Sequence, residues 1–351
     1  MLNIKGNTSG VKSLALVASW VVAAVFQGSL SARLPQSAAL PQSPTVSVAL
    51  SPAEFDLYNH ASTLIDWTPR EIHDCRFLHK LRLASSQEQL SKILARVGQT
   101  GDLLLADFPQ ISCEENVHTE TELPQDRCEE EVFSLHSSAC VATTAATRPD
   151  LLGFPPQDRK FRYIVVPRTK GGLPGFEEYR TDLNGSPLGI SSLTRVYMIT
   201  SNFVSTGLYL TTAHQPESDF RYFGLDATRK RECHVVGFAQ TPERVHTVGL
   251  ITVQGKTAAL LVQGLAWIDS ETFQLLRVTT WLLAPRGDIG LKSSISTVDF
   301  FPVQPSGSEK VLWLPRDVEV EGVFRDIWFR NTHRYSNFKL FRVESTIKPG
   351  P

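Results

Sequence analysis

The feature that most constrains the fold is the second half of the chain, a long series of short strand-like segments without helical patterns between them. These segments are rich in β-branched and aromatic residues, and turn residues such as Asn184-Gly185 separate them. Because no helix intervenes, neighbouring strands should pair antiparallel rather than as βαβ units. We expect strands at Phe161–Val166, Phe176–Asp182, Arg195–Thr200, Gly207–Thr212, Phe220–Asp226, Glu232–Phe238, Val248–Val253, Ala258–Ile268, Leu275–Leu283, Ile295–Phe301, Val311–Glu321, Asp326–Tyr335 and Phe338–Ile347.

One of these segments is apolar on both of its faces. Residues 257–268, TAALLVQGLAWI, carry no charge. By contrast, Val318 and Val320 alternate with acidic residues along a later strand, as expected where one face meets solvent. The segment 257–268 therefore belongs in the middle of a sheet that is covered on both sides, or that faces a cavity.

Three helix starts precede the strands and define a helical lead-in over residues 51–110. Residues 51–54 (Ser-Pro-Ala-Glu), 68–71 (Thr-Pro-Arg-Glu) and 85–88 (Ser-Ser-Gln-Glu) each have the capping-box pattern of a hydroxyl and a carboxylate three residues apart. The third helix carries an apolar stripe, which comprises Leu90, Ile93, Leu94, Val97, Gly101, Leu104, Leu105 and Phe108. We expect this stripe to cover the chain's own sheet; docking on a membrane or a partner is the alternative.

The N-terminus has the order of regions found in a secretory signal peptide. Lys5 and Lys12 precede an uncharged apolar run over residues 13–26, and small and polar residues follow it. The run is shorter than the roughly 20 residues that cross a bilayer, which favours cleavage over retention as an anchor. We therefore expect residues 1–32 to be a signal peptide and residues 33–50, rich in Pro, Ser and Ala, to be a flexible linker. The mature protein is then periplasmic or secreted, without an integral membrane span.

Export would place the five cysteines in an oxidising compartment, where disulfides persist. The odd number leaves at least one thiol unpaired, and no C-x-x-C cluster of a zinc site is present. Cys113, Cys128 and Cys140 lie close enough in sequence for one bridge, with Cys128–Cys140 the first candidate. The alternative is that all five are unpaired.

No catalytic or cofactor-binding motif is present in the sequence. The patterns G-x-S-x-G, H-E-x-x-H, G-x-x-x-x-G-K-[ST] and G-x-G-x-x-G are all absent. The nine histidines are dispersed and are expected at the surface or in caps, and Asp269 and Glu271 are expected to serve a hairpin turn. The formal net charge of −1 gives no positive field for nucleic acid. We expect a protein that is not an enzyme and that uses no cofactor or metal.

Residues 111–158 form an acidic segment that is expected to be rich in loops. Eight carboxylates lie between Glu114 and Glu131, without the order of a calcium loop. A solvated acidic surface is the preferred interpretation and a cation site the alternative. The compact basic triplet Arg229-Lys230-Arg231 is likewise expected to be an exposed turn rather than a site for phosphate.

The segment 249–282 carries a family resemblance. A long apolar strand ends in Ala266-Trp267-Ile268-Asp269 and turns, and the chain returns through residues 273–278 to Arg277. This hairpin resembles that of the outer-membrane lipoprotein-sorting superfamily, and the whole chain resembles exported bacterial proteins that have the same helical lead-in. The resemblance implies a highly curved, unclosed antiparallel sheet over residues 159–347, a half-barrel with helices on its concave side.

The resemblance also implies an apolar concavity that holds an acyl chain or a hydrophobic peptide. Residues that could line it are Leu261, Leu265, Trp267, Leu276, Trp281, Trp313 and Phe329, for which ordinary core packing is the alternative explanation. We therefore expect an α+β protein that binds a lipid or another hydrophobic small molecule. The alternative function is an envelope protein-interaction or sensor protein that engages a partner through the sheet or the acidic segment.

Overall fold

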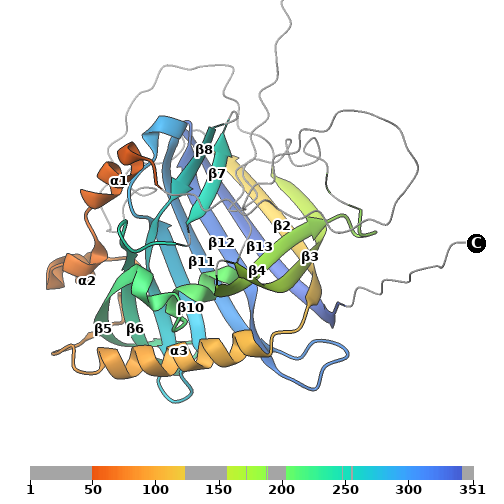
Figure 1. Ribbon diagram of the computed structural model, residues 1–351, viewed down its shortest axis with the longest axis horizontal. Helices are drawn as coiled ribbons and strands as arrows, with labels where there is room; N and C mark the ends of the chain where they lie inside the picture. The colour runs from red at the N-terminus through yellow and green to blue at the C-terminus, as the bar shows by residue number, and fades with distance from the viewer. Residues whose placement is uncertain are drawn as a thin grey trace, which may run out of the picture.

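The computed structural model of the chain describes residues 50–122, 156–170, 172–186, 188, 203–246, 248–253 and 256–341 (Figure 1). The α-helices all lie near the start of the described chain, whereas short 3-10 turns (η) also occur between later strands. The helical elements are α1 (Pro52–Asn59), η1 (Leu64–Asp66), α2 (Pro69–Asp74), α3 (Leu90–Ala106), η4 (Ser205–Leu210), η5 (Gln215–Glu217) and η6 (Gly287–Ile289). The strands are β1 (Arg82–Leu83), β2 (Ile111–Glu122), β3 (Gln157–Lys170), β4 (Leu173–Thr181), β5 (Ser218–Thr228), β6 (Arg231–Gln240), β7 (Gly249–Val253), β8 (Lys256–Leu260), β9 (Val262–Asp269), β10 (Leu275–Leu282), β11 (Leu291–Val303), β12 (Leu312–Phe324) and β13 (Ile327–Leu340).

Eleven strands form one antiparallel sheet that is not closed into a barrel. Its order is β1-β5-β6-β9-β10-β11-β12-β13-β2-β3-β4, so β1 and β4 are its two ends. The strands β7 and β8 form a separate hairpin. The expected fold class, an α+β protein with a large, curved antiparallel sheet and helices near the N-terminus, is confirmed.

Two of the three predicted capping boxes form. Ser51 begins α1 with Glu54 as the reciprocal partner, and Thr68 begins α2 with Glu71. The predicted box at residues 85–88 does not form, because α3 begins only after it; Gln87, inside this segment, instead bonds both backbone groups of Tyr222 on β5. Helix α3 begins at Leu90 without a side-chain cap. Its apolar stripe does cover the chain's own sheet, through Ile93 and Val97.

Helix α1 is fastened to the end of the β7–β8 hairpin by three polar side chains. Tyr58 Oη donates to the Ala259 carbonyl at 2.7 Å, and the Ala259 N–H donates to Glu54 Oε1 at 2.9 Å. Arg286, only 3 % exposed, donates to the same Glu54 oxygen at 3.0 Å and to Asp288. The lead-in is therefore joined to the β7–β8 hairpin and to the β10–β11 connection by polar contacts as well as by apolar packing.

In three segments the strands of the structure differ from those expected from the sequence. Residues 111–122, at the start of the segment expected to be loop-rich, form β2 between β13 and β3. The predicted strand at 207–212 is instead the 3-10 turn η4 and the residues after it. The predicted strand at 258–268 divides at Leu261, because β8 pairs with β7 whereas β9 pairs with β6 and β10.

Several predictions lie outside the described residues. These are the signal peptide at 1–32, nearly all of the linker at 33–50, the disulfide between Cys128 and Cys140, most of the acidic segment and the strand at 195–200. Within the described residues Cys75, Cys113 and Cys233 are free and buried. Cys113 is therefore not a partner in the predicted bridge.

Candidate functional site

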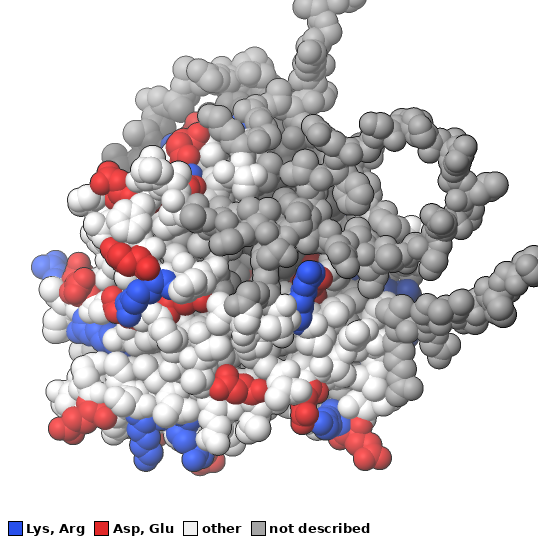
Figure 2. Space-filling view, viewed as in Figure 1, with Lys and Arg blue, Asp and Glu red and all other residues white. Residues whose placement is uncertain are grey.

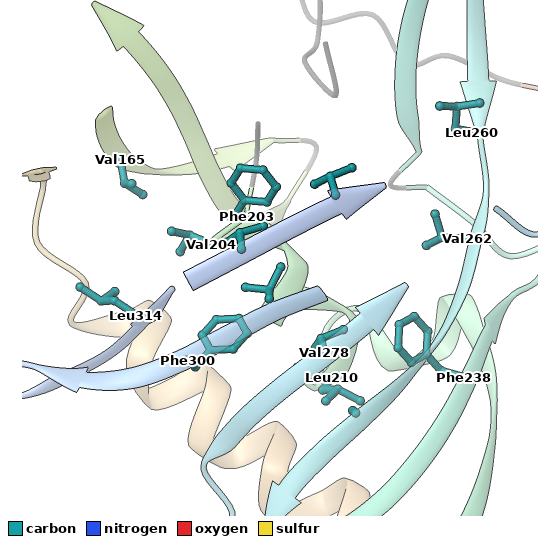
Figure 3. Close-up of a cluster of buried hydrophobic side chains, with 14 of the residues drawn as sticks. Val165, Phe203, Val204, Leu210, Phe238, Leu260, Val262, Val278, Phe300 and Leu314 are labelled. Carbon is teal, nitrogen blue, oxygen red and sulfur yellow. The ribbon is translucent and has the colours of Figure 1, made fainter. Parts of the chain in front are cut away.

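One face of the sheet, called here the inner face, carries the largest apolar cluster among the residues that the structure describes. Its side chains come from strands across the sheet, from Val165 on β3 to Phe238 on β6, and converge on one interior (Figure 3). Helix α3 and the turn η4 add Ile93, Val97 and Leu210 to it. The inner face is therefore covered by separate short elements rather than by a second complete sheet.

A small cavity lies in this cluster. It is lined by Phe108, Ile111, Cys113, Tyr163, Val165, Phe203, Val204, Leu314, Pro315, Tyr335 and Phe338. Its interior free volume is about 10 Å³, whereas a single water needs roughly 10–15 Å³. In this conformation the protein's own side chains therefore nearly fill this cavity.

Two glycines allow α3 to lie against the segment that contains η4 and η5. A Cβ atom on Gly98 would come within 2.8 Å of Gln215 Nε2, and one on Gly101 within 2.9 Å of Thr211 Cγ2. Gln215 also donates to the Leu94 carbonyl on α3 at 2.9 Å and to the Leu210 carbonyl at 2.8 Å. The helix and the turn thus form one cover over the inner face, called the α3–η4 cover below.

Charged and polar side chains are buried beside the cavity, on β2, β3, β4 and β13. Glu115, which is 0 % exposed, accepts hydrogen bonds from Arg180 Nη2 at 2.7 Å, His333 Nδ1 at 2.8 Å and Tyr335 Oη at 2.8 Å. The register places these side chains together, because Tyr335 pairs with Glu115 and Tyr163 pairs with Arg180. We call these five residues, together with Glu178, the inner polar cluster.

Glu178 joins the inner polar cluster to the cover. Its carboxyl group accepts the Tyr163 hydroxyl at 2.5 Å, the Val204 N–H at 3.1 Å and the Ser205 N–H at 2.9 Å. The Ser205 hydroxyl is a fourth donor to it. These bonds hold the start of η4 against β4 and explain why residues 205–210 form a 3-10 turn instead of a strand.

Burial and pairing act on the pKa values of this cluster in opposite directions. Burial alone would raise the pKa of Glu115, but the Arg180 charge and the bonds from Arg180 and His333 lower it to about 2. Burial lowers the pKa of His333 against the opposing effect of Glu115. Burial raises the pKa of Glu178 despite its four donors. At neutral pH the cluster therefore holds an ionised Glu115 and a neutral His333.

The seven residues predicted to line a concavity do not share one face. Phe329 belongs to the inner-face cluster, whereas Leu265, Trp267, Leu276 and Trp281 pack on the opposite, outer face under η1 and α2. Leu261 lies in a third cluster with Tyr58, and Trp313 packs partly against both faces. All seven differ from the residues that line the described cavity.

On the outer face, the predicted lining residues make specific packing contacts. Trp267 Nε1 donates to Asp226 Oδ2 at 3.0 Å, and Trp281 stacks on Trp67 with ring centroids 6.0 Å apart. Trp67 comes from the chain between η1 and α2, so these aromatic residues attach the lead-in to the sheet. The alternation of side chains along β9 puts Leu265 and Trp267 on one face and Ala266 and Ile268 on the other.

The remaining predicted motifs have structural roles. Asp269 accepts the N–H groups of Glu271 and Thr272 in the β9–β10 turn, as expected for turn chemistry. Arg229 and Lys230 have positive φ in the β5–β6 turn, which confirms that the basic triplet is a turn. Arg229 donates to two backbone carbonyls and Arg231 to Asp269, so two of the three cations are held by the protein itself.

The described part of the chain contains no group of three or more His, Cys, Asp or Glu residues placed to hold a metal ion. It also contains no helix with the length and apolar character needed to cross a membrane. On the face shown in Figure 2, charged side chains of both signs are interspersed, mostly near the rim, and no block of one sign gathers over the described residues.

The inner polar cluster was not predicted from the sequence. Glu115 was expected in a solvated acidic surface and His333 at the surface, but both are 0 % exposed. One local signal was present: Glu178 and Arg180 alternate with Phe176 along one predicted strand, which places two opposite charges on its apolar side.

No protein-family model matches the chain, and no curated protein matches it. Solved structures similar to it include a DUF1329 family protein from Desulfovibrio piger, with 11 % identity, a TM-score of 0.34, and coverage of 75 % of this chain and 96 % of that one. A LolA superfamily protein from Nitrosomonas europaea has 13 % identity, a TM-score of 0.32 and coverage of 72 % and 94 %. An outer membrane lipoprotein-sorting protein domain from Vibrio parahaemolyticus has 10 % identity, a TM-score of 0.34 and coverage of 71 % and 92 %. The superfamily that the 249–282 hairpin resembles is thus among these structures, but at this similarity the likeness assigns no ligand.

Proposed function

We propose that this chain is an exported, non-enzymatic protein that binds the apolar chain of a lipid or a similar hydrophobic molecule on the inner face of its sheet. The observation that carries the proposal is the apolar cavity lined by side chains of β2, β3, β12 and β13, by Phe108 just after α3, and by Phe203 and Val204 directly before η4. Burial of apolar surface there would stabilise the complex by roughly 25 cal/mol per Å².

Binding requires the cover to move, because the cavity now has an interior volume of only about 10 Å³. The cover is suited to such movement because it consists of one helix and short turns. Gln215 joins its two parts to each other, and Glu178 on β4 accepts the hydrogen bonds that hold the start of η4 against the sheet. Displacement of α3 and η4 would expose the apolar side chains beneath them without breaking the pairing of the eleven strands.

The proposal includes the localisation and the domain layout expected from the sequence. A cleaved signal peptide at 1–32 would deliver the protein to the periplasm or outside the cell. The flexible linker at 33–50, the helical lead-in at 51–110, the acidic segment at 111–158 and the sheet domain at 159–347 would follow it. N-terminal sequencing of the exported protein tests the first of these points, and a sequence that begins at Met1 contradicts it.

Binding is tested by titration of the full chain with the apolar dye N-phenyl-1-naphthylamine. Gly101→Ala is the informative variant, because its Cβ atom would press on Thr211 at 2.9 Å and weaken closure of the cover. A loss of about 1 kcal/mol in closure raises the open population about fivefold and the apparent affinity by the same factor.

The matched control is Leu103→Ala on the exposed side of α3, where the side chain is 66 % exposed. It should leave dye binding unchanged. If neither the wild type nor Gly101→Ala binds the dye, and native mass spectrometry finds no co-purified lipid, the proposal is wrong.

A protein-interaction or sensor function is the second candidate. The observation that favours it is the position of β4 at one end of the sheet, where Tyr179 is 39 % exposed. An end strand offers backbone groups to a partner strand. Failure of dye binding together with a stable complex recovered from an envelope extract would favour this function.

A further inference from the structure

The polar atom of interest in the inner polar cluster is Nε2 of His333. The His333 side chain is 0 % exposed, and this nitrogen has no hydrogen-bond partner among the described residues. A buried polar atom without a partner costs roughly 1–3 kcal/mol. Such an atom in an otherwise bonded cluster indicates a place where a ligand atom can bind.

The chemistry of the neighbours fixes what Nε2 can bind. The other ring nitrogen, Nδ1, lies 2.8 Å from Glu115 Oε1. An ionised carboxylate only accepts hydrogen bonds, so Nδ1 must carry the hydrogen. In a neutral imidazole the remaining nitrogen, Nε2, then has a lone pair and accepts. The missing partner is therefore a hydrogen-bond donor.

The charges of the cluster disfavour an anion at this position. The Arg180 guanidinium is already matched by two bonds to Glu115. The carboxyl of Glu178 lies on the same strand as Arg180, on the same face. The hydroxyl groups of Tyr163 and Tyr335 donate to Glu178 and Glu115. A carboxylate or phosphate would thus meet a second acidic group and no uncommitted cation in the cluster.

His333 and the cavity share neighbours. The Phe203 ring lies 4.8 Å from the His333 ring and lines the cavity, as Tyr335 does. Phe203 directly precedes Val204 and Ser205, which Glu178 holds at the start of η4. Movement of the α3–η4 cover would therefore carry Phe203 away from the imidazole.

We propose, on the basis of the function proposed above, that His333 Nε2 accepts a hydrogen bond from the polar end of the ligand, and that this end is an uncharged hydroxyl or amide rather than a carboxylate or phosphate. The ligand class is then a long-chain alcohol, an acylglycerol or an N-acyl amide. Its apolar chain occupies the cavity and the inner face beyond it, while its donor group ends at β13.

Displacement of the dye N-phenyl-1-naphthylamine at pH 8 tests this assignment with three probes of one chain length. The probes are 1-dodecanol, dodecanoate and methyl dodecanoate, which carry a donor, an anion and an acceptor respectively. The wild type should bind 1-dodecanol about tenfold more tightly than either of the others, as one hydrogen bond of about 1.4 kcal/mol predicts.

His333→Phe keeps a ring of similar shape and removes the acceptor. It should reduce affinity for 1-dodecanol about tenfold and leave that for methyl dodecanoate unchanged. The same substitution at His118, a half-exposed residue of β2 whose ring bonds Asp158, should preserve the preference. If His333→Phe does not fold, the ¹⁵N resonance of His333 Nε2 in the wild type replaces it, and should shift with 1-dodecanol but not with methyl dodecanoate.

The outcomes separate the two proposals. Equal affinity for the three probes, or a preference for dodecanoate, overturns the assignment of His333 but leaves hydrophobic binding intact. An unchanged His333 resonance in a complex with 1-dodecanol also overturns it. Displacement by none of the probes, with no binding of the dye itself, refutes the binding function and this inference with it.

Discussion

Glu115 carries a full negative charge in a side chain that is 0 % exposed, and such a charge is stable only when it is compensated. Arg180, His333 and Tyr335 supply four hydrogen bonds to its two oxygens. They come from β4 and β13, which flank β2 and β3 in the sheet. A single carboxylate therefore ties together strands that are more than 140 residues apart in the chain.

Substitution of Glu115 by Gln leaves the Arg180 charge buried without its partner. We expect the free energy of unfolding to fall by about 3–5 kcal/mol at pH 7, as for other broken buried ion pairs. Urea denaturation followed by far-UV circular dichroism measures this change. The control is Glu114→Gln, at an exposed position on the same strand, which should change the free energy by less than about 0.5 kcal/mol.

The loss of unfolding free energy in Glu115→Gln should depend on pH. The pKa of Glu115 is lowered to about 2 in the folded state from 4.5, so its stabilising effect is complete above about pH 4.5 and is lost as the pH falls toward 2. The penalty of Glu115→Gln should therefore shrink between pH 5 and pH 3. Burial raises the pKa of Glu178, so its effect on stability has the opposite sign. A penalty that stays constant across this range would show that Glu115 is not ionised in the folded protein.

At the scale of elements, the sequence predicted best where the determining contacts are local. The capping boxes at Ser51 and Thr68 form because every partner lies within three residues. The third box does not form, and in that segment the Gln87 side chain bonds the distant Tyr222 instead. The turn η4 was missed for the same reason, since the Glu178 carboxyl group that caps it belongs to another strand.

Strand pairing between β9 and β10 depends on a glycine that the sequence does not distinguish from others. A Cβ atom on Gly264 would lie 2.3 Å from the Thr279 carbonyl oxygen of β10. We expect Gly264→Ala to lower the free energy of unfolding by about 3 kcal/mol, because the backbones of two central strands must separate. Thermal or urea unfolding measures the loss.

The matched control is Gly287→Ala in η6, where an added Cβ atom meets nothing within 4 Å. That variant should unfold within about 0.5 kcal/mol of the wild type. Equal effects at the two glycines would mean that β9 and β10 are not packed as closely as described.

For the whole molecule, residue alternation predicted that the sheet has two covered faces but not which residues line the inner-face cavity. The β9 part of the apolar segment 257–268 is covered on both sides, by the inner-face cluster and by η1 and α2. The aromatic residues Trp267 and Trp281 lie on the outer side of that arrangement. Which side chains lie on the inner face and which on the outer face depends on how the lead-in packs on the sheet. This packing joins residues that are far apart in the sequence.

The chain order of the sheet links the lead-in to the C-terminus. Strand β2 directly follows α3 and pairs with β13, the last strand, so neither the lead-in nor the later strands complete the sheet alone. We therefore expect the helical lead-in and the eleven-stranded sheet to unfold in one cooperative transition. Tryptophan fluorescence and far-UV circular dichroism should give the same urea midpoint.

Tyr58→Phe on α1 tests this coupling from the lead-in. It removes the hydrogen bond to the Ala259 carbonyl at 2.7 Å and should lower the free energy of unfolding by about 1 kcal/mol. Because we expect α1 and the sheet to unfold together, the fluorescence and circular dichroism signals should both shift to the same lower urea midpoint. If the fluorescence midpoint moves while the circular dichroism midpoint stays, the lead-in unfolds as a separate unit, and its contacts through Tyr58 and Arg286 do not couple it to the sheet.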